Sequence, residues 1–579
     1  MKQIWMYMKN YKKETVLAPL FKMLEACFEL GVPLVIASLT DVGIRNGDKG
    51  YVVKMGLVLL ALAAVGFGCS VVAQYFSARA AVGVATKLRH NLFKHIESLS
   101  FSEIDKVGTS TLITRMTSDV NQVQSGVNML LRLFLRSPFI VFGAMVMAFT
   151  IDVKSALIFV VTIIVLLIVV FAIILYTIPM YKRVQSALDR VLGITRENLT
   201  GARVIRAFGM EDDEIEEYDN RTGLLFKLQV GVGRISALMN PVTLFIINGA
   251  TIILVWTGAI QVNDGKLSQG EVIALVNYMS QILVELVKLA NLIVTLTKAV
   301  ACGNRIEGIF EIQSSLQLKD ALNGEDDANC EYAVEYDNVS IRYMDSAEES
   351  MKDVSFKIKK GETVGVIGGT GSGKTTLIQA IPRFYDVSEG QIRVNGKDVK
   401  DYALKDLRDR IAVVLQKAVL FKGTIRENLL WGKEDATEAE IYEALDRAQA
   451  REFVDNKEKG IEEMVEQGGR NLSGGQRQRL TIARALIRKP EILILDDSSS
   501  ALDYATDAKL RIAIKELSEE SDTTVIIVSQ RATSIMHADK IVVLDDGEVA
   551  GIGTHDELLE NNQVYKEIYM SQNAEKSNV

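Results

Sequence analysis

The amino-acid sequence predicts an α-helical membrane domain of six transmembrane helices followed by a soluble α/β domain. Two observations lead to this fold class. Six long apolar stretches lie before about Phe310, and beyond that point the apolar runs are short and separated by polar turns. Hydrophobic residues make up 48% of the 579 residues while charged residues still reach 24%, which is typical of an apolar region joined to an ordinary soluble one.

Each apolar stretch is close to the length of about 20 residues that an α-helix needs to cross a bilayer. The clearest stretch contains no charged residue at all. The six predicted spans are Thr15–Ser38, Val53–Ala78, Met129–Thr150, Ser155–Tyr176, Ala237–Ile260 and Val272–Leu296. The first span carries Glu25 and Glu29, and the last carries Glu285 and Lys288. Because charges in lipid are costly, we expect these side chains to face a cavity or a partner helix.

The connections between the spans alternate in length. Short polar links follow the first, third and fifth spans, whereas the connections Arg79–Gly126 and Lys182–Arg234 are long and charged. Their Lys and Arg content, together with the basic N-terminus, places them in the cytoplasm of a multi-pass protein of the inner (plasma) membrane. Helical periodicity predicts that the spans continue into these connections. Glycine breaks within both predict short transverse helices at their tips.

Charge, cysteine usage and the N-terminus exclude several classes of protein. The net charge of −8 lacks the basic character of nucleic-acid-binding domains, so no nucleic acid is expected as a partner. The four cysteines are far apart and contain no CxxC pair, which indicates neither a disulfide framework nor a zinc site. No short apolar core with a small-residue cleavage site follows the N-terminus, so no removed signal peptide is expected.

The soluble part begins after a polar linker that ends near Cys330, and its first candidate functional motif is a glycine-rich loop. The segment GETVGVIGGTGSGKTTLIQAI predicts a strand, a phosphate-binding loop and a helix, in the order that this motif requires. Backbone N–H groups of such a loop and the start of the helix bind phosphate oxygens. Lys374 is expected to reach the β and γ phosphates, and Thr375 to hold Mg²⁺. The candidate phosphate-binding residues are Gly368, Gly369, Thr370, Gly371, Ser372, Gly373, Lys374, Thr375 and Thr376.

Two further motifs follow. EILILDD is an apolar strand that ends in two carboxylates, and Asp496 is the expected Mg²⁺ partner there. Just before it lies LSGGQ, with Ser473, Gly474, Gly475 and Gln476 as candidate nucleotide-binding residues. LSGGQ between a phosphate loop and a DD pair resembles the signature of ATP-binding cassette (ABC) proteins, and this resemblance covers Cys330 to about Met570.

The resemblance implies further roles within the cassette. Tyr343 resembles the aromatic residue that stacks on adenine, and Gln416 resembles the glutamine that joins Mg²⁺ to the helical subdomain. The segment Ser500 to Asp503 resembles the loop that crosses the interface of two cassettes. The cofactors implied are therefore ATP and Mg²⁺.

The membrane half resembles that of ABC exporters of the multidrug type, on the fragments GTSTLITRMTSDV and ENLTGARVIRAF. The fold class implied is a six-helix membrane domain with long intracellular extensions fused to an α/β P-loop ABC ATPase domain. We expect a membrane domain over residues 1–315, a linker over 316–330 and the cassette over 331–579. By resemblance, the tips of the long connections rest on the cassettes. Phe208 and Glu211 are candidates for that contact, and Glu466, which lies shortly before the signature, is the candidate residue that responds to it.

Two residues depart from the pattern of a fully active cassette. Asp497 stands where the family has the Glu that orients the attacking water, and misplacing such a group by about 1 Å can cost about 100-fold in rate. Gln530 stands where the family has a switch histidine, and an amide cannot carry the proton that imidazole can. The nearby His537 is out of register. Together these changes resemble the degenerate-site subunit of bacterial heterodimeric exporters, which implies a second half-transporter as partner.

The sequence therefore predicts ATP-driven export of small hydrophobic or amphipathic molecules by one half of a heterodimer that contacts membrane lipid. Three alternatives stay open: a homodimeric exporter of lipid or peptide, an ATP-gated regulatory membrane subunit, and a soluble ATPase, which the spans disfavour. Substrate identity is beyond the sequence. Candidate cavity residues are Tyr75, Phe76, Tyr278 and Met279, although such residues more often serve in packing.

Overall fold

The computed structural model describes residues 6–316, 330–343, 348–498 and 501–573. The chain divides into two compact units. One contains Met1–Glu97 and Thr109–Ile312, and the other contains Ser98–Gly108 and Gln313–Val579. The short segment Ser98–Gly108 thus belongs to the second unit although it lies in sequence between two helices of the first.

The first unit is entirely helical and contains six helical segments, among the described residues, that are long and apolar enough to cross a membrane. They are Met6–Ile44, Lys49–Glu97, Thr109–Ile151, Val153–Phe208, Glu211–Asn263 and Gln269–Phe310. All six predicted spans fall within these segments. Their α-helices are α2 (Lys12–Ser38), α3 (Lys49–Glu97), α5 (Thr109–Thr114), α6 (Val120–Leu133), α7 (Arg136–Ile151), α8 (Val153–Phe208), α9 (Glu211–Ala237), α10 (Met239–Asn263) and α11 (Gln269–Phe310).

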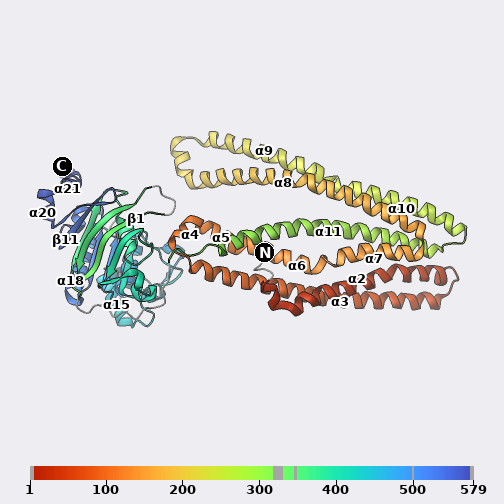
Figure 1. The fold of residues 1–579 in the computed structure, drawn as a ribbon, viewed down its shortest axis with the longest axis horizontal. Helices are drawn as coiled ribbons and strands as arrows, with labels where there is room; N and C mark the ends of the chain where they lie inside the picture. The colour runs from red at the N-terminus through yellow and green to blue at the C-terminus, as the bar shows by residue number, and fades with distance from the viewer. Residues whose placement is uncertain (1–5, 317–329, 344–347, 499–500, 574–579) are drawn as a thin grey trace. The chain divides into compact units, whose positions relative to one another are not determined.

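The helices continue well past the predicted spans, as expected. In Figure 1, α8 and α9 run side by side as one long hairpin. The first tip carries the expected short helix, α4 (Phe101–Val107), which Ser100 caps at its start and Gly108 ends. The second tip differs from the prediction, because Gly209 adopts a left-handed conformation (φ 64°) and α9 begins two residues later. The glycine there makes a tight turn and no separate helix.

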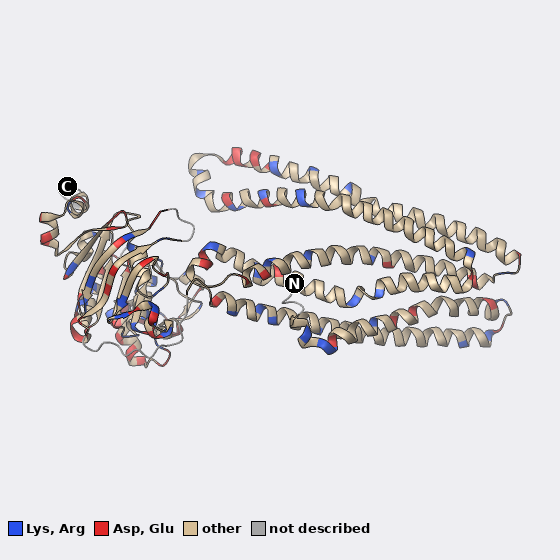
Figure 2. Cartoon of the chain, viewed as in Figure 1, with Lys and Arg blue, Asp and Glu red and all other residues tan. Residues whose placement is uncertain are grey.

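Charged side chains inside the membrane unit form a bridging network. In Figure 2, charged residues are frequent near the tip between α8 and α9 and sparse along the middle of the long helices. Arg136, at the start of α7, donates to Glu285 of α11 and to Glu29 of α2, both at 2.6 Å. Lys288 pairs with Glu285 at 2.8 Å, and Glu25 pairs with Lys22 at 2.6 Å. The expectation of a partner helix is confirmed for Glu29 and Glu285, which bond to Arg136 of α7, whereas Lys288 and Lys22 pair with carboxylates of their own helices.

Two of the candidate cavity residues lie in the core instead. Tyr278 and Met279 are fully buried, and the Tyr278 hydroxyl donates to the backbone oxygen of Leu30 at 2.6 Å. They serve in packing, the commoner role of such residues, because the face of α11 that carries them packs against α2 and α7. Tyr75 of α3 is 59% exposed, and its ring lies 5.5 Å from that of Phe76.

The second unit is built on sheets whose strands are β1 (Tyr332–Ile341), β2 (Met351–Lys359), β3 (Thr363–Gly368), β4 (Glu389–Val394), β5 (Lys397–Asp398), β6 (Ile411–Val414), β7 (Gly423–Thr424), β8 (Met464–Val465), β9 (Ile492–Asp496), β10 (Thr524–Val528), β11 (Lys540–Asp545) and β12 (Glu548–Gly553). The order β12-β11-β3-β10-β9-β6 forms the central sheet, which is parallel except at the β12 edge. An antiparallel sheet has the order β2-β1-β4-β5.

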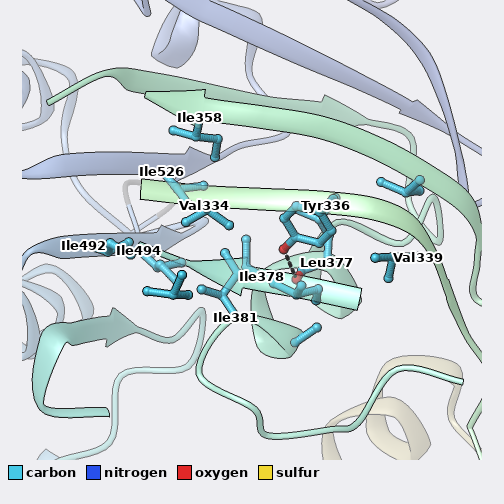
Figure 3. Packing of buried hydrophobic residues seen from close by; sticks show 14 of the residues in the cluster. Val334, Tyr336, Val339, Ile358, Leu377, Ile378, Ile381, Ile492, Ile494 and Ile526 are labelled. Atoms are coloured by element: carbon cyan, nitrogen blue, oxygen red, sulfur yellow. Dashed lines mark hydrogen bonds between the residues drawn. The ribbon is translucent and has the colours of Figure 1, made fainter. Parts of the chain in front are cut away.

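One hydrophobic core joins the two larger sheets. Helix α12 (Lys374–Ala380) contributes Leu377 and Ile378 to it, beside Ile494 and Ile526 of the central sheet (Figure 3). The buried hydroxyl of Tyr336 donates to the Leu377 backbone oxygen at 2.9 Å. The start of α12 is thereby fixed relative to both sheets.

A second core supports a mainly helical subdomain. It includes the four helices α14 (Ile425–Leu430), α15 (Glu438–Arg447), α16 (Arg451–Asp455) and α17 (Gly474–Leu486). The remaining helices of the unit are α13 (Leu404–Arg410), α18 (Tyr504–Ser521), α19 (Ala532–Ile535), α20 (His555–Asn561) and α21 (Gln563–Asn573).

Candidate functional site

Three neighbouring parallel strands deliver the predicted site residues to one edge of the central sheet. Strand β10 pairs with β3 on one side and with β9 on the other, so that Val528 lies beside Val366 and Asp496. The glycine-rich loop follows β3, the two carboxylates end β9, and Gln530 follows β10. Carboxyl ends of parallel strands at such an edge are the usual place for a ligand.

The backbone of the glycine-rich loop leaves no room for side chains at two positions. A Cβ on Gly368 would lie 2.3 Å from the backbone oxygen of Leu544 and 2.4 Å from the Ser372 hydroxyl. Gly373 has φ 90° and would place a Cβ 2.7 Å from the Ser350 oxygen. These glycines let the chain curl tightly into the start of α12, so that its N–H groups face the loop interior.

Lys374 lies inside this curl. Its Nζ donates to the backbone oxygens of Gly368 and Gly369 at 2.9 and 2.6 Å. Burial lowers the pKa of Lys374, while Asp497 and Asp496 act against that shift. The ammonium group is therefore held where phosphate oxygens would enter the loop.

The side chains of Asp496 and Thr375 contact each other in the site. The Thr375 hydroxyl donates to Asp496 Oδ2 at 3.4 Å. Burial raises the pKa of Asp496 and the adjacent Asp497 adds to the rise, whereas Thr375 and Lys374 oppose it. A hydroxyl beside a buried carboxylate is a donor set that suits Mg²⁺. The glycine curl, Lys374 and this pair together fit a magnesium nucleotide.

Asp497 and Gln530, the two residues that differ from the pattern of an active cassette, line one cavity together with the phosphate loop. This cavity has a volume of about 470 Å³. Asp497 adopts a left-handed backbone conformation (φ 45°), and its Oδ2 accepts a hydrogen bond from Gln416 Nε2 at 3.3 Å. Gln530 is exposed, and its backbone oxygen accepts from Gln572 at 2.7 Å. The structure thus brings Gln416, Asp496, Asp497, Gln530 and residues 370–376 together.

The signature residues lie elsewhere. Ser473 caps the start of α17, with its hydroxyl accepting from the Gln476 N–H at 3.3 Å and the Gln476 side chain accepting from the Ser473 N–H at 3.0 Å. None of residues 472–480 is among the described residues that line the cavity. Ser500 lies outside the described residues. The signature of this chain therefore does not line its own loop cavity.

Tyr343 lies beside the cavity wall and not on it. Its hydroxyl bonds with the Thr376 hydroxyl at 3.1 Å, and its ring centroid lies 5.0 Å from that of Tyr385. The predicted tip residue Phe208 is 77% exposed, Glu211 opens α9, and Glu466 is exposed before the signature.

Sequence reasoning missed a further part of the cavity lining, which consists of Glu348, Glu349, Ser350, Asp546 and Gly547. The turn between β11 and β12 supplies the last two. Its DDG sequence after an apolar strand is a hairpin signal, but nothing local to it indicates that it lies next to a loop far away in sequence.

Known proteins resemble this chain along its whole length. Residues 15–286 match the ABC transporter transmembrane region family and residues 351–500 match the ABC transporter family. The chain is 36% identical over 98% of its length to the uncharacterized ABC transporter ATP-binding protein YfiB of Bacillus subtilis, of which it covers 97%. It is 33% identical to the putative multidrug export ATP-binding/permease protein YgaD of the same organism, with 99% of both chains covered.

A solved structure shows the same fold. The structure of a bacterial Atm1-family ABC exporter with ATP bound superposes with a TM-score of 0.79, at 23% identity, over 97% of this chain and 98% of that one. The chain belongs to the ABC transporter family and has the arrangement of an exporter half, one membrane region followed by one ATPase domain. It is an ATP-driven multi-pass membrane transporter.

Proposed function

We propose that this chain is the degenerate-site half of a heterodimeric exporter of hydrophobic or amphipathic small molecules. The observation that carries the proposal is the composition of one cavity wall. An intact phosphate loop lines the same cavity as Asp497 and Gln530, which stand where, by resemblance, an active cassette has Glu and His. The same wall therefore supports nucleotide binding and disfavours fast hydrolysis.

The loop residues bind and orient the nucleotide in this proposal. Lys374 and the loop N–H groups hold the β and γ phosphates, while Thr375 and Asp496 hold Mg²⁺. When bound, the metal neutralises charge on those phosphates. Asp497 is one methylene shorter than Glu, and its Oδ2 lies 3.3 Å from Gln416, so it reaches less far toward an attacking water. Gln530 lacks the charge of a histidine.

The signature residues act on the opposite nucleotide. Because residues 472–480 are not among the described lining of their own cavity, Ser473 and Gly475 are free to complete the active site of a partner. Export then follows from closure of two cassettes around two nucleotides, with hydrolysis at the partner's site resetting the pair. In this arrangement the ATPase domain and the N-terminus are on the cytoplasmic side of the plasma membrane.

A groove on the second unit suits the partner's tip. The cavity of about 400 Å³ has aromatic side chains, Phe384, Phe421 and Trp431, and basic side chains that include Arg408 and Lys417. The tip between α8 and α9 of a half-transporter like this one offers Phe208 and a first turn of four acidic residues. Aromatic and charge complementarity therefore support this groove as the binding site of the partner's tip.

The character of the cargo is supported by a cavity of about 280 Å³ between α2 and α11. Its wall combines apolar side chains, among them Val32 and Ile36, with the polar side chains of Glu29, Asn277 and Gln281. A wall of both kinds suits an amphipathic molecule.

The test is ATPase activity of the chain alone, of the chain co-purified with candidate half-transporters, and of the variant carrying Asp497→Glu and Gln530→His. We expect little turnover from the lone chain and strong turnover with a partner that has an intact Glu. The double variant should raise turnover of the pair. Robust turnover by the lone chain, lost on Asp497→Asn, would instead show a homodimeric pump with Asp497 as a working base.

In the proposed pair, the signature of this chain acts at the partner's nucleotide and its phosphate loop acts at its own. Substitutions in these two motifs therefore give a sharper comparison within the co-purified pair. Ser473→Ala in this chain should lower turnover about tenfold or more, because it removes a donor from the partner's active site. Lys374→Ala should have the smaller effect, since it disables only the degenerate site. Equal effects of the two substitutions would contradict the proposed asymmetry.

A further inference from the structure

We propose that Tyr385 is a positioning residue that ties the base-stacking Tyr343 to helix α4, so that ATP affinity depends on a contact with the connection between the first unit's helices. The inference rests on the proposed role of Tyr343 at adenine. Tyr385 is not part of the phosphate loop, and no motif singled it out.

The Tyr343 side of this link is fixed at two points. The rings of Tyr343 and Tyr385 meet edge to face, with centroids 5.0 Å apart and an interplanar angle of 88°. The Tyr343 hydroxyl bonds with that of Thr376, 3.1 Å away in the first turn of α12. A shift of the Tyr385 ring therefore changes the plane that Tyr343 offers to a base.

The other side of the link reaches α4. The Tyr385 hydroxyl donates to Asp105 Oδ2 at 2.6 Å, and burial together with Asp105 raises the pKa of Tyr385, so the hydroxyl remains a donor. Beside it, the rings of Phe101 and Phe384 lie 4.9 Å apart. Since Ser98–Gly108 belongs to the second compact unit, these contacts lie within one unit.

The turn that presents Tyr385 is held by several side-chain hydrogen bonds. Arg383 has φ 55° and is 2% exposed, and it donates to both carboxylate oxygens of Asp386, at 2.7 and 3.1 Å. Arg408 donates to the backbone oxygens of Pro382 and Arg383, both at 3.1 Å. Tyr385 therefore transmits a displacement of Asp105 to Tyr343 instead of absorbing it in a mobile loop.

Linkage gives the functional consequence. If the Tyr385–Asp105 hydrogen bond places Tyr343 better for the base, then binding of the base favours formation of that hydrogen bond by the same factor. Occupancy of the base position is thereby communicated to the segment that joins α3 and α5. A purely structural role for Tyr385 predicts no such dependence on the base.

The experiment uses the full-length chain in detergent and compares the Kd for MgATP with the Kd for inorganic tripolyphosphate, which lacks a base. Tyr385→Phe keeps the ring and removes the hydroxyl, and Asp105→Ala removes the acceptor. Each should weaken ATP binding on the order of fivefold, at the low end of coupling between sites, and leave tripolyphosphate binding unchanged. The double variant should match either single variant, because both remove one bond.

Tyr402→Phe is the matched control, since it deletes a buried hydroxyl bond to Val394 in the same unit, away from α4. Equal weakening of ATP and tripolyphosphate, or no change in ATP affinity, overturns the proposal. Tyr343→Ala separates the two levels of inference. If Tyr343→Ala leaves ATP affinity intact, its role at the base fails and the link fails with it. If Tyr343→Ala weakens only ATP while Tyr385→Phe and Asp105→Ala do nothing, the link alone is wrong.

Discussion

At the scale of single residues, the backbone conformation of the site sets what each position accepts. Asp497 stands at φ 45°, in the left-handed region, and its N–H donates to the Val528 oxygen at 2.9 Å. Asp tolerates this region better than most residues because its short side chain bonds locally. The Asp there is therefore well suited to the backbone even though it is short for the chemistry.

Gly368 is a loop position with no space for a larger residue. Its Cβ would meet the Leu544 oxygen at 2.3 Å, and a backbone atom cannot move aside as a side chain can. We expect Gly368→Ala to lower the free energy of unfolding by about 1 to 3 kcal/mol, the usual cost of overpacking. Thermal unfolding of the full chain measures this change.

Gly369 provides the matched control, because a Cβ there meets no atom within 4 Å. Gly369→Ala should alter the unfolding temperature much less than Gly368→Ala. Similar losses for both variants would show that steric contact with Leu544 is not the cause.

At the scale of elements, helix α15 shows how a local charge pattern stabilises the helical subdomain. Thr437 and Glu440 form a capping box, with the Glu440 carboxylate accepting from the Thr437 N–H at 2.8 Å. Lys433 donates to the same carboxylate group at 2.7 Å. Bonds from Lys433 and Thr437 lower the pKa of Glu440 from 4.5 to about 2.

The pH dependence of this contribution has a definite sign. A lowered carboxyl pKa stabilises the folded state above the unfolded value of 4.5, and that stabilisation is lost as pH falls toward 2. Wild type should therefore unfold at a higher temperature than Glu440→Gln at pH 7, and the gap should shrink as the pH drops below 4.5. A gap that does not change with pH would mean that the charge of Glu440 contributes nothing.

At the scale of the whole molecule, Arg136 joins three helices of the membrane unit. Its side chain is 8% exposed and pairs with Glu285, whose side chain is 2% exposed, and with Glu29 on another helix. Removing one partner of a buried ion pair leaves the other charge without compensation. Arg136 is thus the structural centre of the polar network, while Glu29 also lines the cavity between α2 and α11.

We expect Arg136→Met to cost about 3 to 5 kcal/mol of stability, measured by thermal unfolding in lipid nanodiscs. Adding Glu285→Gln should recover part of the loss, because it removes a charge left unpaired. Arg132→Met, four residues earlier, is the control, since the buried Nε of Arg132 has no hydrogen-bond partner among the described residues. A double variant as unstable as the sum of the single variants would contradict the coupling.

Much of this organisation was predictable from local patterns. Run length revealed the spans, and the loop after β3 carried its own strand, glycine and helix signals. Contacts distant in sequence gave no such signal. Nothing near Tyr385 points to Asp105, nothing near Tyr278 points to the Leu30 oxygen that its hydroxyl bonds, and the tip at Gly209 is a turn because one left-handed residue suffices. Which partner lies on which face is decided by packing, which a single sequence does not display.

The membership of Ser98–Gly108 in the second unit has a consequence for biosynthesis. Helix α4 leaves the ribosome long before Phe384 and Tyr385 are made, and at about 5 to 20 residues per second the wait is on the order of 10 to 60 s. During that time Phe101 has no aromatic neighbour to pack on. The surface around Phe384 and Tyr385 therefore packs against α4 only after the second unit has been synthesised. Nascent chains stalled before residue 384 should be cleaved by proteases at α4, whereas longer nascent chains should be protected there.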